Sequence, residues 1–443
     1  MIECPGCGGN LKFDIATQKM HCAFCDSQYD PYQFDEKEKD AEEQKDYEVT
    51  VFTCPQCGGE LYSTDNAAAA FCSFCGASTI LYSRISRERR PEFVIPFQKT
   101  KEDCKREYMK KVKKALFLPK EFKEEKYIDS FRGIYMPYWS YNMMQEGYIT
   151  LKGEESHRSG DYIVHNHYDL RGYLSAFYHG ITHDASSSFE DNISECLQPY
   201  NVKEKKEFTP GFLSGFYADV ADVASGTYED EAQVFAYEQS MKNIRNTKEF
   251  RRYKIKENQK TQNLHTKTRS VEATMFPVWF LSYRNKERVA YAAVNGQTGK
   301  VVADLPIAPK KYLLGTGIIA SILFLLFNLF FTLKPSFVLA WAIALGWITV
   351  GAYLMELIRI ARRKNEKIPF GKNAGGLLYL GIAEAVGILL EMIRPVSDWF
   401  YYGGVIFMAV GIAASFLYVI RCYNVMATRR LPQFDKKGGD DRA

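Results

Sequence analysis

The sequence lacks the marks of an exported protein and of a nucleotide-binding enzyme. Residues 1–5 show no basic region followed by an apolar one, so no secretory signal peptide is predicted. No Gly-rich phosphate loop of the Walker or Rossmann type occurs. The net charge is only +4 over 443 residues, which excludes a histone-like wrapper of nucleic acid. With 46% hydrophobic residues, 31 Gly and 16 Pro, disorder along the whole chain and collagen-like classes are excluded as well.

Cysteine is abundant at the N-terminus. Eight of the eleven cysteines form four Cys-x-x-Cys pairs: Cys4, Cys7, Cys22, Cys25, Cys54, Cys57, Cys72 and Cys75. The second four repeat the first four at an offset of 50 residues. Two such pairs, about 15–20 residues apart, are typical of a zinc ribbon, in which four thiolates close a tetrahedral site. The sequence therefore predicts two structural Zn²⁺ ions, which stabilise units too small to fold on their own cores.

Two further features of the repeat bear on its chemistry. The glycines that follow the first pair of each unit (Gly8, Gly9, Gly58 and Gly59) suit the positive-φ backbone of a tight knuckle. Redox chemistry is the alternative use of a Cys-x-x-Cys pair, but it requires one pair on a βα unit. Four pairs in two matched units favour zinc.

The composition divides the chain into several domains. The fold class predicted is two small-β zinc ribbons, a cytoplasmic α+β domain and a C-terminal unit of four transmembrane helices. The predicted ranges are 1–34 for ribbon 1, 35–50 for an acidic linker, 51–83 for ribbon 2, 90–305 for the α+β domain, 312–421 for the helices and 422–443 for a cytoplasmic tail. Within the α+β domain we expect helices at 101–118 and 229–248 and strands at 161–180 and 275–302.

Four apolar stretches, at 313–333, 336–355, 374–393 and 399–420, each have about the 20 residues that cross a bilayer. Lysine and arginine precede the first stretch, fill the loop between the second and third, and follow the fourth. By the positive-inside rule, both termini are predicted in the cytoplasm of a multi-pass cell-membrane protein.

Three sets of residues are candidate sites besides the cysteines. Glu384 lies near the centre of the third apolar stretch, where an ionised carboxylate is costly, so it either serves transport or is a protonated side chain that bonds a neighbouring helix. His165, His167, His179 and His183 form either a second metal site or an ordinary polar strand surface. The segment 184–188 contains three serines but lacks the strand–turn–helix context of a nucleophile elbow.

The net charge of the ribbons indicates which class of partner they can bind. Residues 1–30 have a net charge of −2, from Lys12 and Lys19 against Glu3, Asp14, Asp26 and Asp30. Residues 51–83 contain no Lys or Arg and also have a net charge of −2. Phosphate binding needs basic side chains, so the ribbons favour protein partners over nucleic acid.

Several phrases between 94 and 279 carry a family resemblance: VIPF at 94–97, GIYMPYW at 133–139, LQPY at 197–200, FTPGFLSGF at 208–216 and FPVW at 276–279. With the ribbons, they resemble bacterial membrane-anchored proteins called TFIIB-type zinc ribbon-containing proteins, sometimes labelled primosomal-helicase-like. The resemblance implies recruitment of partners beside phage-shock-like and flotillin-like proteins in envelope stress. The two Trp phrases predict either strand anchors in the core or an aromatic platform.

We therefore expect a non-enzymatic integral membrane protein. Its double zinc ribbon would recruit cytoplasmic or membrane-associated proteins, and formation of a homo-oligomer stays open. One alternative is a transporter or channel subunit that uses Glu384, and the other is a membrane-tethered nucleic-acid binder.

Overall fold

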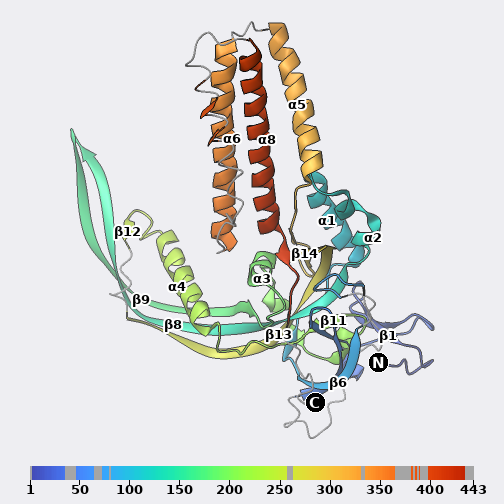
Figure 1. Ribbon diagram of the computed structural model, residues 1–443. Coiled ribbons are helices and arrows are strands. Elements are labelled where there is room, and N and C mark those ends of the chain that lie inside the picture. Colours follow the sequence, from blue (N-terminus) through green and yellow to red (C-terminus); the bar gives the residue numbers. More distant parts are fainter. Residues whose placement is uncertain are drawn as a thin grey trace, which may run out of the picture.

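The computed structural model describes residues 2–34, 46–63, 72–78, 81–256, 263–330, 335–364 and 398–434, with five isolated positions between 381 and 389. A small N-terminal β-unit and a large curved sheet form one end of the described part, and long helices form the opposite end (Figure 1). The three parts agree with the predicted order of two cysteine-rich units, an α+β domain and an apolar C-terminal region.

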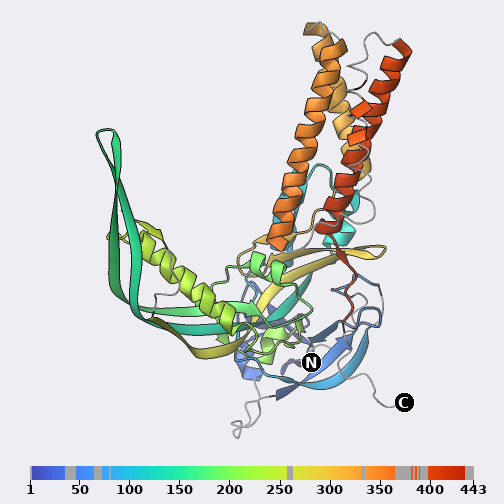
Figure 2. The ribbon, with the colours of Figure 1, turned by 60° about the vertical axis from the view of Figure 1, so that its left-hand side comes forward.

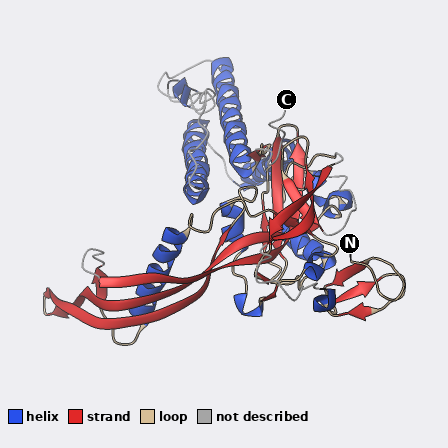
Figure 3. Ribbon diagram, turned by 90° about the horizontal axis from the view of Figure 1, so that it is seen from below, coloured by secondary structure: helices blue, strands red, loops and turns tan. Residues whose placement is uncertain are grey.

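The N-terminal unit is a three-stranded antiparallel sheet in the order β1-β2-β3, formed by Leu11–Asp14, Lys19–Cys22 and Gln28–Tyr29. Figure 3 shows it set apart from the main sheet, next to the N-terminus. A short 3₁₀ turn, Pro31–Phe34, follows it.

The main sheet has the strand order β10-β7-β13-β8-β11-β5-β4-β6, and further strands pair with β8, β13 and β14. Its strands are β4 Asp46–Thr53, β5 Glu60–Ser63, β6 Tyr82–Arg89, β7 Phe93–Val94, β8 Arg132–Ser159, β9 Tyr162–Asp184, β10 Lys206–Glu207, β11 Tyr217–Asp219, β12 Lys254–Lys256, β13 Asn263–Asn285, β14 Arg288–Asn295, β15 Val301–Ala303 and β16 Arg429–Arg430. The predicted strands at 161–180 and the meander at 275–302 are confirmed.

The sheet extends into a long arm. Strand β8 has 28 residues and β9 has 23, and they pair along almost their whole length, with β13 on the other edge of β8. Both are far longer than the usual strand of 3–10 residues. Helix α4 (Glu229–Asn246) packs on the arm through Met241 and Ile244, against Ile149 and Leu151. Figures 1 and 2 show the end of the arm raised on the same side of the sheet as the long helices.

The two Trp phrases lie opposite each other in the core. Strands β8 and β13 pair so that Met136 faces Phe276 and Trp139 faces Ala273. Each indole N–H donates to a backbone carbonyl, Trp139 to Val223 and Trp279 to Lys99, both at 2.8 Å. The structure thus places these phrases as strand anchors.

The remaining described helices of the α+β domain are short, apart from α1. They are α1 Lys101–Lys114, α2 Glu125–Ile128, α3 Asp191–Leu197 and the 3₁₀ turns Lys120–Lys123, Val202–Glu204 and Pro210–Leu213. Helix α1 begins with a capping box in which Thr100 and Asp103 each bond the other's backbone N–H. Its apolar face is buried at Cys104, Tyr108 and Val112. The helix ends at Lys114, four residues before the predicted end, and Leu116 is exposed.

The C-terminal region contains the helices α5 Pro309–Phe330, α6 Pro335–Lys364 and α8 Asp398–Ala427. Within the described residues, one segment, Ala409–Ala427 of α8, is long and apolar enough to cross a membrane. The third predicted stretch, 374–393, lies almost wholly outside the described residues, so the four-helix unit predicted from sequence is not seen as such.

Two predicted domain boundaries differ from the structure. Ribbon 2 is not a separate small domain, because β5 pairs with β11 of the α+β domain and β4 pairs with β6. Residues 46–50 of the predicted linker belong to β4, and residues 35–45 lie outside the described part. The basic residues between the predicted ranges of ribbon 2 and the α+β domain belong to strand β6, an edge strand of the main sheet, on which polar side chains alternate.

The C-terminal helices also exceed their predicted range. Helix α5 begins at Pro309 and α8 ends at Ala427, because basic residues end an apolar stretch without ending a helix. Beyond α8 the chain turns back to the sheet, where β16 pairs with β14. The predicted cytoplasmic tail is therefore partly ordered against the α+β domain, as far as Phe434.

One buried carboxyl makes the stability of this domain depend on pH. Burial raises the pKa of Asp184 to about 7, and the nearby Asp191 and Glu195 act in the same direction, against a hydrogen bond with Ser194. The side chain is 4% exposed, and no described residue forms a hydrogen bond with its Oδ2. The folded state then binds more protons than the unfolded state between pH 4 and 7, so the free energy of unfolding falls as pH rises through that window.

We expect Asp184→Asn to stabilise the protein at pH 8 by about 2–4 kcal/mol, because a shift of one pKa unit corresponds to about 1.4 kcal/mol. The gain should shrink at pH 5, where Asp184 is protonated in the folded state. Thermal unfolding of the full chain in detergent at the two pH values measures it. An equal change in melting temperature at both values would contradict the assignment.

Candidate metal centres

The eight predicted ligands come together in two groups of four. Within each group, Cys4-Cys7-Cys22-Cys25 and Cys54-Cys57-Cys72-Cys75, all sulfur atoms lie within 4.8 Å of one another. The Sγ–Sγ distances are 3.5 Å for Cys4–Cys25 and 3.8 Å for Cys54–Cys75. A tetrahedron with Zn–S bonds of about 2.3 Å has edges of about 3.8 Å, so both groups fit a zinc ion.

Each knuckle is held by its own backbone hydrogen bonds. The N–H of Gly8 donates to the Cys4 carbonyl and that of Gly58 to the Cys54 carbonyl, both at 2.9 Å. Gly8 and Gly58 have φ values of 72° and 75°, as predicted for a tight knuckle. Hydrogen bonds with Ser27 lower the pKa of the Cys25 thiol to about 6, which favours the thiolate that a metal needs.

The second glycine of each pair serves a different purpose from the one predicted. A Cβ at Gly9 would lie 2.5 Å from Cδ2 of Phe24, and a Cβ at Gly59 would lie 2.6 Å from Cδ2 of Phe74. Both positions therefore exclude a side chain because an aromatic ring of the opposite knuckle lies on them.

Ribbon 1, which we define as residues 2–34, is attached through β1 to the segment 208–216. The N–H of Phe13 donates to the Ser214 carbonyl at 3.0 Å, and Ser214 Oγ donates to the Leu11 carbonyl at 2.5 Å. The rings of Phe13 and Phe212 meet edge to face, with centroids 5.2 Å apart. The FTPGFLSGF phrase thus fixes the position of ribbon 1.

Ribbon 2, which we define as residues 54–59 and 72–77, is covered by two other segments of the chain. The hydroxyl of Tyr291 on β14 donates to the Phe74 carbonyl at 2.8 Å. The N–H of Phe434, beyond α8, donates to the Cys57 carbonyl at 2.7 Å, and its ring meets that of Phe74 at 5.7 Å. All four thiols are buried as a result.

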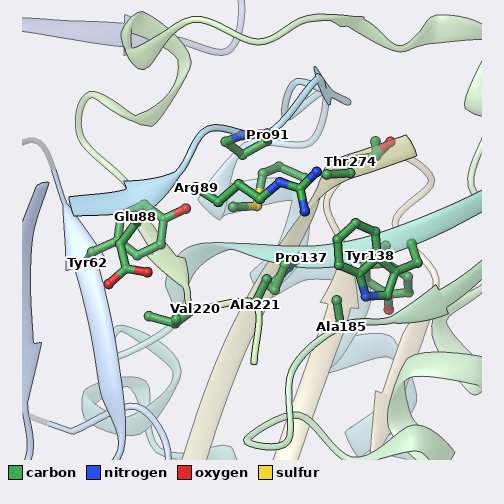
Figure 4. A pocket seen from close by; sticks show the side chains of 13 residues that line it. Tyr62, Glu88, Arg89, Pro91, Pro137, Tyr138, Ala185, Val220, Ala221 and Thr274 are labelled. Atoms are coloured by element: carbon green, nitrogen blue, oxygen red, sulfur yellow. The ribbon is translucent and has the colours of Figure 1, made fainter. Parts of the chain in front are cut away.

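A small cavity lies where strands β5 and β6 meet the middle of the main sheet at β8 and β13 (Figure 4). It holds about 50 Å³ and is lined by Tyr62, Pro137, Trp139 and Thr274, among others. The Arg89 guanidinium lies 5.9 Å from the centroid of the Trp139 ring. The space suits one or two water molecules, since each occupies about 30 Å³ in the liquid.

Comparison with known proteins finds a relative that is similar in sequence over most of the chain. Uncharacterized protein YdjG of Bacillus subtilis (strain 168) is 34% identical over 315 residues, which cover 70% of this chain and 91% of YdjG. The chain belongs to the YdjG family. No family model matches it, and no solved structure matches it.

The four candidate histidines of this YdjG-family chain do not come together in the described structure. The four histidines follow one strand, β9, and His165 and His183 are 18 residues apart, or about 60 Å at 3.3 Å per residue. His165 instead bonds Glu154 at 2.8 Å, and His183 stacks on Tyr228. In the described part of the chain, only the two cysteine groups assemble metal ligands.

The serines of the 184–188 loop bond carboxylates. Ser186 and Ser188 both donate to Asp219, whose pKa is raised by burial to about 6, and Ser187 donates to Asp222. The hydroxyls therefore fix the loop to the end of β11. Glu384 lies outside the described part of the chain, so neither of its two predicted roles is tested.

We expect the purified full chain to contain two zinc ions per molecule, since both groups offer four thiolates and no open position. Atomic emission spectrometry of protein from zinc-supplemented cells measures the ratio. Treatment with a thiol reagent that releases zinc should free ribbon 1 zinc first, because Cys7 and Cys25 are exposed while Cys57 and Cys75 are buried. A single release phase would contradict this order.

Proposed function

We propose that this chain is a non-enzymatic, membrane-anchored bacterial protein whose zinc ribbons recruit protein partners to the membrane surface. The observation that carries the proposal is the contrast between the ribbons. Ribbon 2 is buried by segments of its own chain, whereas ribbon 1 is rigidly attached and presents its second knuckle to solvent. A closed Cys4 site does no chemistry, so its use is to hold that surface in shape.

The net charge of the exposed ribbon supports a protein partner. Residues 1–30 have a net charge of −2, and a Zn²⁺ ion with four thiolates adds two further negative charges. Such a surface repels phosphates. The described part of ribbon 1 therefore disfavours the nucleic-acid alternative.

The surfaces of the long helices support the membrane anchor. Helix α5 exposes Leu314, Ile318, Ile322, Leu325, Leu329 and Phe330, each more than half exposed, and α8 exposes Trp399, Ile406 and Val410. Water does not tolerate contiguous apolar surface of this extent. We propose that α5, α6, α8 and the stretch 374–393 are the four spans, with the sheet in the cytoplasm.

The basic residues agree with that orientation. Lys310 and Lys311 lie at the first turn of α5, Arg359 and Arg362 near the end of α6, and Arg421 near the end of α8. All these helix ends point toward the sheet (Figure 1). Positive charge on this side supports a cytoplasmic sheet and cytoplasmic termini. A role in envelope stress or membrane organisation rests on the resemblance to membrane-anchored TFIIB-type zinc-ribbon proteins.

A cross-linked pull-down from native membranes tests the proposal. The wild type is compared with a variant that carries serine at Cys4 and Cys7, which dissolves ribbon 1 and leaves ribbon 2 intact. We expect specific proteins to be lost from the variant, while recovered nucleic acid stays unchanged. Retention of every captured protein would refute recruitment by this ribbon, and a salt-sensitive loss of nucleic acid would favour the tethered binder.

A further inference from the structure

The two ribbons are equivalent in sequence but not in their surroundings. Phe24 and Phe74 occupy the same position of the repeat, yet Phe74 is 1% exposed and Phe24 is 82% exposed. Each ring lies on the equivalent glycine, Gly9 or Gly59. The two ribbons therefore have the same local structure at this ring and glycine, and they differ in that ribbon 2 is covered by other segments of the chain.

In ribbon 2 that cover is an aromatic residue on an extended segment. Phe434 packs its ring on both Phe74 and Gly59, with its Cδ2 3.2 Å from the position of a Cβ at Gly59. Its backbone N–H donates to the Cys57 carbonyl, and the Tyr291 hydroxyl donates to the Phe74 carbonyl. Phe434 thus contributes an aromatic ring and a backbone N–H donor, and Tyr291 contributes a hydroxyl donor.

The same acceptors exist on ribbon 1 without donors. Among the described residues, none donates to the carbonyl oxygens of Cys7 or Phe24, which correspond to those of Cys57 and Phe74. Cys7 and Cys25 are exposed, whereas Cys57 and Cys75 are buried. Ribbon 1 therefore presents an aromatic ring, a glycine floor and two carbonyl acceptors to solvent, and we name this surface the ribbon 1 seat.

We propose that the ribbon 1 seat binds an extended segment of a different protein, in which an aromatic residue follows basic residues, in the manner that ribbon 2 binds Phe434. The basic residues suit the net negative charge of ribbon 1. Asp26, two residues after Phe24, is exposed, and one of its carboxylate oxygens bonds the His21 ring at 2.6 Å. The tail of a second copy is a poorer occupant, because each copy's Phe434 already covers its own ribbon 2. This inference rests on the proposed recruiting function and specifies the surface and the partner.

A peptide with the sequence of residues 428–434, TRRLPQF, is the probe. Fluorescence anisotropy measures its binding to the full chain in nanodiscs. We expect Phe24→Ser to weaken binding at least about tenfold, as for loss of one buried aromatic contact. Ile85→Ser is the matched control, because Ile85 is an exposed apolar residue on β6, and it should leave binding unchanged. Binding that survives Phe24→Ser, or the absence of binding to the wild type, would overturn the seat.

A photo-reactive phenylalanine analogue at position 24 then identifies the occupant in native membranes. We expect adducts with another protein, mapped to an extended segment that contains an aromatic residue. Adducts with a second copy of this chain would overturn the choice of partner.

Zinc content separates the two proposals, because Phe24→Ser should keep two ions. If captured proteins are lost from the Cys4/Cys7 variant but not from Phe24→Ser, the seat is refuted and recruitment stands. If neither variant loses a captured protein, recruitment itself is refuted.

Discussion

Cys75→Ser should leave little folded protein, whereas Cys25→Ser, at the equivalent position of ribbon 1, should yield a folded α+β domain. All four thiols of ribbon 2 share a buried cluster with main-sheet residues such as Phe52 and Leu61, whereas in ribbon 1 two thiols are buried in such a cluster and Cys7 and Cys25 are exposed. A structural zinc contributes about 10–16 kcal/mol of apparent binding free energy, comparable to the whole stability of a domain at about 5–15 kcal/mol. Loss of the zinc in ribbon 2 therefore removes most of what stabilises the sheet.

The two variants form a matched pair, since each removes one thiolate from a Cys4 group. Gel filtration in detergent measures the folded fraction, and atomic emission measures the zinc. We expect Cys25→Ser to elute as the wild type does, with one zinc ion, and Cys75→Ser to aggregate. Equal folded fractions for the two variants would show that ribbon 2 does not stabilise the sheet.

Arg429→Gln should release the segment that follows α8 from the sheet. The Arg429 side chain forms ion pairs with Asp304 and Glu190, and its guanidinium lies 5.3 Å from the centroid of the Tyr291 ring. It is 13% exposed, so its removal leaves two carboxylates in a partly dry site. Breaking one partner of a buried ion pair costs about 3–5 kcal/mol, and partial exposure reduces this to roughly 2–4 kcal/mol.

Hydrogen exchange measured by mass spectrometry detects this release directly. Peptides that contain residues 429–434 should exchange faster in Arg429→Gln, and so should peptides that contain Phe74. Arg430→Gln is the control, because Arg430 is the exposed neighbour on the same strand and should change stability by less than about 0.5 kcal/mol. Unchanged protection of residues 429–434 in Arg429→Gln would contradict the role given to the ion pairs.

The cysteine groups were predictable because zinc ligation is a local matter. Spacing within a Cys-x-x-Cys knuckle sets the backbone turn, and the repeat at 50 residues gives the second group from the first. The face of α1 was predictable for the same reason, through the spacing of Cys104, Tyr108 and Val112. The role of Gly9 and Gly59 was not, because the ring that excludes a side chain there comes from the opposite knuckle.

The union of ribbon 2 with the main sheet could not be read from the sequence. It depends on residues such as Leu61, which pairs with Asp219 across 158 positions of the chain. The strand at 161–180 was predicted, but the long arm that it forms with β8 was not. Residues such as Tyr162 and Ile163 are exposed on both faces of β9, so no buried face in the sequence indicates the strand with which they pair.

Ribbon 2 is among the first parts of the chain to be synthesised and among the last to be completed. Its cysteines, and the eight-residue strand β4 that precedes them, leave the ribosome long before Phe434, which covers Phe74 only after α8 has been made. Until then the Phe74 ring and the Cys57 carbonyl stay bare, as Phe24 and Cys7 do in the finished protein. Ribbon 2 is therefore covered only when α8 and the segment after it have been synthesised. A chain that ends before residue 434 would expose the aromatic ring of both ribbons.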